Sequence, residues 1–104
     1  MPVPYVMLRA AIDGGQLDRV RLLAKDMPPM KLDDALRVLF LMRGLPDYEA
    51  AVVRWMGRFA VEGKGVTPTD LSEALSYLRD LPNEPSLLED LLQLAAERGV
   101  GRAT

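Results

Sequence analysis

The side chains of this sequence that could do chemistry are mainly carboxylates, and several of them occur in close pairs. The pairs are Asp33 with Asp34, Asp47 with Glu49, Asp70 with Glu73, and Glu89 with Asp90. Paired carboxylates can work as a general acid and base, or can bind a divalent cation. A helical Mg²⁺ site needs several carboxylates three or four residues apart on facing helices, and within the expected helices only Asp70 and Glu73 have this spacing. We therefore expect no metal site.

The residue types that are missing narrow the chemistry further. The chain has no cysteine and no histidine, so it has no disulfide, thiolate nucleophile, Cys/His zinc site or imidazole base. Catalysis would have to rely on carboxylate, lysine, tyrosine or hydroxyl groups. We predict no catalytic residue, no cofactor-binding residue and no cofactor.

Most charges can be explained by the helices that carry them. Each acidic pair lies in or near the first turn of an expected helix, and Arg43, Lys64, Arg79 and Arg98 lie near helix C-termini. Charges placed in this way complement the helix dipole and contribute about 0.3–1 kcal/mol each. Glu49 is the exception, because it lies near the apolar face of its helix. We expect it to be partly buried and paired with an arginine.

Glycine and proline divide the chain into segments with helical periodicity. The segments cover residues 4–13, 16–26, 32–43, 46–62, 68–80 and 87–98. Three starts have recognisable signals: Pro46 at a first helical position, Thr67 before a proline and an acid, and Ser86 with Glu89 as a capping box. No segment alternates with period two, so the sequence predicts an all-α protein.

The connections between these segments are short, so neighbouring helices should pack antiparallel. Residues 32–43 are apolar almost all round, which is typical of a central, buried helix. We predict six short helices arranged as three antiparallel αα-hairpins, and favour a compact bundle over a solenoid. Residues 1–104 should form one domain, with residues 99–104 as a frayed tail.

The overall charge and hydropathy point away from nucleic acid and membranes. The net charge is −2 and the pI is near 5.1, so no global positive field attracts phosphates or anionic lipid. The N-terminus does not resemble a signal peptide, and no apolar run approaches the roughly 20 residues of a membrane span. We expect a cytoplasmic protein that does not bind membranes. The preference for arginine over lysine is typical of a GC-rich bacterial genome.

Residues 8–23 contain Ala10 and Ala11, a glycine turn at Gly14 and Gly15, and then apolar residues beginning with Leu17. This segment resembles the helix–turn–helix core of one ankyrin repeat. It lacks the Thr-Pro-Leu-His opening and does not recur at the period of about 33 residues that ankyrin arrays have. The resemblance implies protein–protein binding without catalysis.

Residues 65–75 look like the first helix of a bacterial DNA-binding helix-turn-helix. A recognition helix should then present Arg, Lys, Asn or Gln near its N-terminus. The next helix instead begins with Glu84, Glu89 and Asp90 nearby, which would repel phosphates. The sequence therefore disfavours nucleic-acid recognition by this pair of helices.

The segment 54–59 is the strongest candidate for a binding surface. Trp55 and Phe59 are four residues apart, as are Arg54 and Arg58 on the opposite side, and Gly57 would let another backbone approach closely. Tryptophan and arginine are common interface anchors. We predict a protein-interaction or assembly module that binds a partner protein or itself, with homodimerisation possible. The candidate partner-binding residues are Glu49, Arg54, Trp55, Arg58 and Phe59.

Three alternatives stay open at this point. The aromatic residues could be core and the arginines simply solvated. Glu49, Arg54 and Tyr48 could form a small-ligand or carboxylate-based enzyme site, which requires a cavity of about 300 Å³ or more with convergent polar groups. Arg37, Arg54 and Arg58 could bind nucleic acid weakly.

Overall fold

The computed structural model describes residues 3–25 and 27–100, which form six α-helices and no strand. The helices are α1 (Val3–Asp13), α2 (Leu17–Ala24), α3 (Leu32–Met42), α4 (Tyr48–Glu62), α5 (Pro68–Asp80) and α6 (Leu87–Glu97). The predicted all-α class is therefore confirmed. Within the described ranges, no helix has the length and apolar character needed to cross a bilayer.

The starts of α5 and α6 test two predicted caps. At α5 the Thr67 hydroxyl accepts the N–H of Asp70 at 3.1 Å, and the Asp70 carboxylate accepts the N–H of Thr67 at 2.9 Å. This reciprocal capping box begins the helix as predicted. The capping box predicted for Ser86 and Glu89 is wrong. Ser86 has a helical backbone and its side chain makes no cap hydrogen bond, because a turn already precedes α6.

The predicted start of α4 at Pro46 is also wrong. The N–H of Tyr48 donates to the carbonyl of Leu45, so Pro46 lies in a turn and the helix begins at Tyr48. α2 ends at Ala24, two residues before the predicted end at Asp26, which lies outside the described residues.

Gly99 and Val100, which we expected to belong to a frayed tail, instead form an ordered helix end. Gly99 has a φ of 71°, and the N–H groups of Gly99 and Val100 donate to the carbonyls of Ala96 and Ala95. This is a Schellman motif, in which glycine takes the left-handed conformation that other residues resist. Val100 is buried in the core. The tail prediction is therefore wrong for these two residues, and residues 101–104 lie outside the described part.

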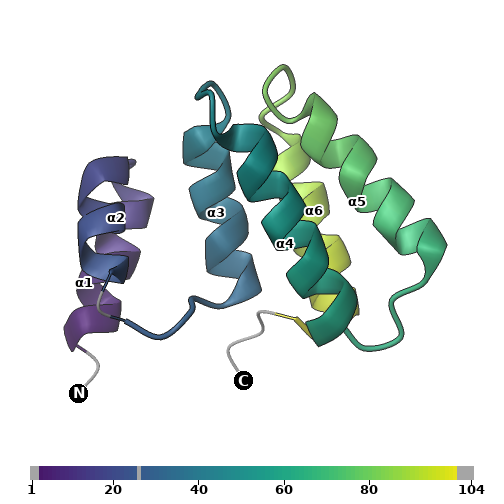
Figure 1. Ribbon diagram of the computed structural model, residues 1–104, viewed down its shortest axis with the longest axis horizontal. Helices are drawn as coiled ribbons and strands as arrows, with labels where there is room; N and C mark the ends of the chain where they lie inside the picture. Colours follow the sequence, from purple (N-terminus) through teal and green to yellow (C-terminus); the bar gives the residue numbers. More distant parts are fainter. Residues whose placement is uncertain (1–2, 26, 101–104) are drawn as a thin grey trace.

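The helices pack as three successive hairpins, α1–α2, α3–α4 and α5–α6, as predicted (Figure 1). α3 contacts α1, α2, α4 and α6, and none of its residues is exposed. The arrangement is a compact bundle with extents of 37 × 30 × 21 Å. The central position that we predicted for residues 32–43 is confirmed.

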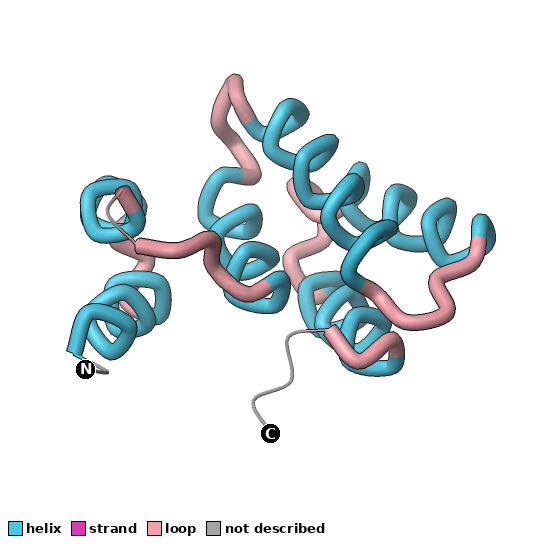
Figure 2. The backbone as a smooth tube through the Cα atoms, turned by 60° about the horizontal axis from the view of Figure 1, so that its bottom comes forward, coloured by secondary structure: helices cyan, strands magenta, loops and turns pink. Residues whose placement is uncertain are grey.

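The buried apolar side chains fall into two groups. A main core joins α3, α4, α5 and α6, and a smaller one lies between α1 and α2 and consists of Leu8, Ala11, Ile12 and Val20. Val38 of α3 packs against both groups. Figure 2 shows the α1–α2 pair standing beside the other four helices, joined to α3 by an extended connection. The first hairpin is therefore attached mainly through α3.

A buried carboxylate reinforces that attachment. The Asp34 side chain has no exposed area, and its oxygens accept hydrogen bonds from the Tyr5 hydroxyl at 3.0 Å, Arg9 at 3.2 Å and Arg37 at 3.3 Å. Tyr5 and Arg9 belong to α1, so this carboxylate links two hairpins. A charge can be buried in this way only when hydrogen-bond donors surround it.

Candidate functional site

Helix α4 has one buried and one exposed side. Tyr48, Ala51, Val52, Trp55 and Phe59 are buried, and they lie together on a helical wheel because successive residues turn by 100°. α4 therefore supplies core residues along its inner side. The two flanks and the outer face of α4 are the sides that a ligand or a partner protein can contact.

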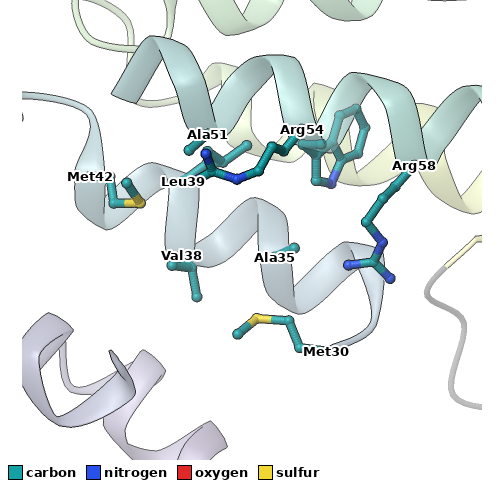
Figure 3. A pocket seen from close by; sticks show the side chains of 9 residues that line it. Met30, Ala35, Val38, Leu39, Met42, Ala51, Arg54 and Arg58 are labelled. Carbon is teal, nitrogen blue, oxygen red and sulfur yellow. The ribbon is translucent and has the colours of Figure 1, made fainter. Parts of the chain in front are cut away.

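A groove of about 290 Å³ runs between α3 and α4 on one of these flanks. Figure 3 shows Arg54 and Arg58 extending from α4 on the side that faces α3. The rest of the lining is apolar: Met30, Ala35, Val38, Leu39, Met42, Ala51 and Trp55. An apolar surface edged by two cations can accept apolar side chains and carboxylates from one ligand.

The two arginines differ in their electrostatic partners. Arg58 donates two hydrogen bonds to the Glu62 carboxylate, at 2.8 and 3.3 Å, so its charge is already balanced. Arg54 is exposed, and among the described residues it has no ion-pair partner. Arg54 is therefore the cation at this groove that can bind an incoming carboxylate without first breaking an ion pair.

The two aromatic candidates of this segment serve the core. The Trp55 indole N–H donates to the carbonyl of Leu32 at 3.0 Å, and the Trp55 and Phe59 rings stack with centroids 5.0 Å apart. Trp55 is 3% exposed and lines the groove, whereas Phe59 has no exposed area at all. Trp55 thus contributes to the floor of the groove. Phe59, which we predicted as a partner-binding residue, is inaccessible to a partner.

The expectation that Glu49 is partly buried and paired with an arginine is wrong. Its side chain is exposed, and within the described ranges no cation lies in ion-pair distance of it. Glu49 lies in the first turn of α4. It lines a second hollow of about 370 Å³ between α4 and α5, on the flank away from Arg54.

The proposed catalytic combination of Glu49, Arg54 and Tyr48 is therefore not assembled. Glu49 and Arg54 line different hollows on opposite flanks of α4. The Tyr48 hydroxyl donates to the carbonyl of Leu78 at 2.6 Å, and burial raises the pKa of this hydroxyl to about 12. Such a tyrosine holds α4 against α5 and does not easily give up its proton.

Like Asp34, Asp70 is a buried carboxylate, and it too is held by partners within the fold. Asp70 combines its capping role with an ion pair to Arg98 at 2.9 Å, which joins the start of α5 to the end of α6. The backbone N–H of Thr67 and then the guanidinium of Arg98 lower the pKa of Asp70. Among the residues placed in the structure, no three acidic side chains come close enough together to hold a metal ion.

The three arginines suggested for nucleic-acid binding do not act together either. Arg37 donates to Asp33 and Asp34 at 3.3 Å, and Arg58 is paired with Glu62. Only Arg54 of the three is without a carboxylate partner in the described part of the chain. A phosphate backbone would need several available cations, so these residues do not form a basic patch.

One side of the groove was not predicted from the sequence. It is provided by α3 and the preceding loop, namely by Met30, Val38, Leu39 and Met42. Because α3 is apolar on nearly every side, its periodicity does not indicate which side the other helices leave uncovered. Comparison of the chain with protein-family models, with curated proteins and with solved structures gives no match. The function therefore has to be argued from the groove and the neighbouring surface.

Proposed function

We propose that this chain is a protein-interaction module without catalytic activity, and that a partner protein binds in the groove between α3 and α4. The observation that carries the proposal is an open apolar groove of about 290 Å³ with a cation at its edge that lacks a carboxylate partner among the described residues. Such an arrangement suits a peptide segment better than a polar metabolite, because it offers few groups that could orient a small polar molecule.

The chemistry of the groove defines the segment that should fit it. Apolar side chains of the partner would cover Val38, Leu39 and Trp55, and an Asp or Glu of the partner would pair with Arg54. An amphipathic helix with apolar residues three and four apart and an acidic flank has this pattern. Burial of the apolar side chains supplies most of the affinity, while the charge pair supplies orientation and specificity.

The test is affinity capture from a lysate of the native host, with variants that change the charge at the edges of the groove. Tagged wild-type protein is compared with Arg54→Glu, which reverses the edge charge, and Met30→Glu, which places a charge at the other edge. Arg19→Glu on α2 is the matched control, because Arg19 is an exposed arginine that does not line the groove. A partner of the groove should be retained by wild type and the control, and reduced at least about tenfold by both groove variants.

Any captured protein is then divided into synthetic segments and titrated against wild type and Arg54→Glu. The expected result is one acidic, amphipathic segment whose binding weakens with salt and with the charge reversal. If the same proteins are captured by all four versions, or if only basic segments bind, the groove is not the binding site and the proposal is wrong.

A further inference from the structure

The outer face of α4 is apolar and uncovered by any described residue. Val53 is 71% exposed and Val61 is 84% exposed, and Ala50, Gly57 and Ala60 are exposed beside them. A Cβ added to Gly57 would meet no atom within 4 Å. Figure 1 shows α4 passing in front of α6, between α3 and α5, so this face points away from the bundle. Exposed valines on one face of a helix are typical of an interaction surface.

The spacing along this face is that of a helix that packs on another helix. Ala50, Val53, Gly57 and Ala60 are separated by three, four and three residues, which are the first and fourth positions of two heptads. The buried residues of α4 occupy the remaining side, so this face can be covered without disturbing the core. The alanines and the glycine allow a close approach, and the valines supply the apolar contact.

The charges on either side of the row favour a particular partner. Glu49 comes directly before Ala50 and Arg54 directly after Val53, so the two charges flank the row on opposite sides. In two parallel helices with the same register, the residue directly before a first heptad position lies beside the residue five positions later in the other helix. Glu49 of each copy then lies beside Arg54 of the other, and the pair occurs twice.

We propose that the protein self-associates as a parallel dimer through this outer face of α4, with Glu49 and Arg54 pairing between copies. Neither residue has an ion-pair partner among the described residues of its own chain. The same register also brings Met56 of each copy beside Val61 of the other. An antiparallel pair would place like flanks together and leave these charges unpaired, so the charge pattern selects the parallel arrangement.

The size of the face sets the strength of the dimer. The 15 residues of α4 span about 22 Å, which allows only two heptads of contact. This is smaller than the interface of a typical tight complex, so association should be weak, with a dissociation constant between about 10 µM and 1 mM. The dimer goes beyond the groove function and shares only Arg54 with it.

The experiment is sedimentation equilibrium of the full chain up to about 1 mM, at low salt and at high salt. Glu49→Arg and Arg54→Glu should each weaken the dimer about tenfold. In either variant, both contacts between position 49 of one copy and position 54 of the other become pairs of like charges. The double variant Glu49→Arg with Arg54→Glu should restore the wild-type constant to within about threefold, because the pairs re-form with exchanged positions. Arg19→Glu should have no effect.

The double exchange also separates this inference from the groove function. It restores the dimer but leaves the groove with a reversed edge charge, so binding of an acidic segment would stay lost. A chain that is monomeric at about 1 mM, or a double variant that is no stronger than the single ones, would overturn the dimer while leaving the groove proposal intact. Circular dichroism of each variant verifies that the helices still form.

The absence of cysteine permits a direct measurement of orientation. In the parallel register Ala50 lies beside Ala50 of the other copy, so Ala50→Cys should form an intermolecular disulfide readily on mild oxidation. Ser72→Cys, an exposed position on α5, is the matched control and should cross-link at least about tenfold more slowly. Equal rates for the two variants would exclude the parallel dimer even if some self-association were observed.

Discussion

The replacement of Asp34 by asparagine tests whether this buried carboxylate serves architecture. The substitution keeps the shape of the side chain but removes its charge, and it turns an amide N–H₂ group toward arginine donors. A hydrogen bond to a charged group contributes about 1.5–3 kcal/mol net when it is buried. The arginine partners are 36% and 25% exposed, so water can replace part of what they lose. We expect a total loss of about 2 kcal/mol for the three hydrogen bonds together.

This loss should be measured by urea denaturation and by thermal unfolding, followed by circular dichroism. For a domain of about 100 residues, 2 kcal/mol corresponds to a fall in Tm of about 10 °C. Hydrogen exchange should locate the effect. Because the α1–α2 hairpin is attached mainly to α3, amides of α1 should lose more protection than amides of α4.

Asp13→Asn is the matched control. Asp13 pairs with the same Arg9 that contacts Asp34, at 3.0 Å, but its side chain is 60% exposed. A surface pair of this kind contributes only about 0–0.5 kcal/mol. If Asp34→Asn and Asp13→Asn gave equal losses, or if Asp34→Asn cost less than about 0.5 kcal/mol, the view that Asp34 fastens α1 to α3 would be refuted.

Three further predictions concern single residues elsewhere in the fold. Trp55→Phe should cost about 1–3 kcal/mol in urea denaturation, because the hydrogen bond from the buried indole N–H to the Leu32 carbonyl is lost and the smaller ring fills less of the core; a loss within error would contradict this. Because the pKa of Asp70 is lowered in the folded state, its contribution to stability is present above the ordinary aspartate pKa and is lost as the pH falls through the lower, folded-state pKa. Between about pH 5 and pH 2, the free energy of unfolding should therefore fall less steeply with decreasing pH for Asp70→Asn than for wild type. Gly99→Ala should lower stability by about 1–2 kcal/mol in the same assay, since alanine must adopt a φ of 71°, and an unchanged Tm would argue against the Schellman end of α6.

Local patterns in the sequence were enough to predict most of the secondary structure. The capping box at Thr67 and the helical periodicity after it act over a few residues, so α5 has the bounds that were predicted. The errors at Pro46 and Ser86 occurred where a turn preceded the helix and satisfied its first backbone groups in another way. Sequence signals for helix starts cannot distinguish these cases, because both use the same residue types.

The candidate site could be predicted only in part. The sequence identified Arg54, Arg58 and Trp55, because large side chains and charges at helical spacing are visible without a structure. It could not assign Met30 and Val38 to the same groove, since their proximity depends on how α3 and α4 pack. Phe59 was included on the basis of its residue type and its spacing from Trp55, although packing leaves it no exposed area.

Asp33 and Asp34 illustrate the difference between what the local sequence determines and what tertiary contacts determine. Both are aspartates in the first turn of α3, and the sequence treats them alike. In the fold, Asp33 keeps 22% of its side-chain exposure, whereas Asp34 keeps none because α1 packs over it and supplies two of its donors. Helix formation was determined by short-range periodicity and caps. Burial, pairing and the open groove were decided by contacts between residues distant in the chain, which no local pattern encodes.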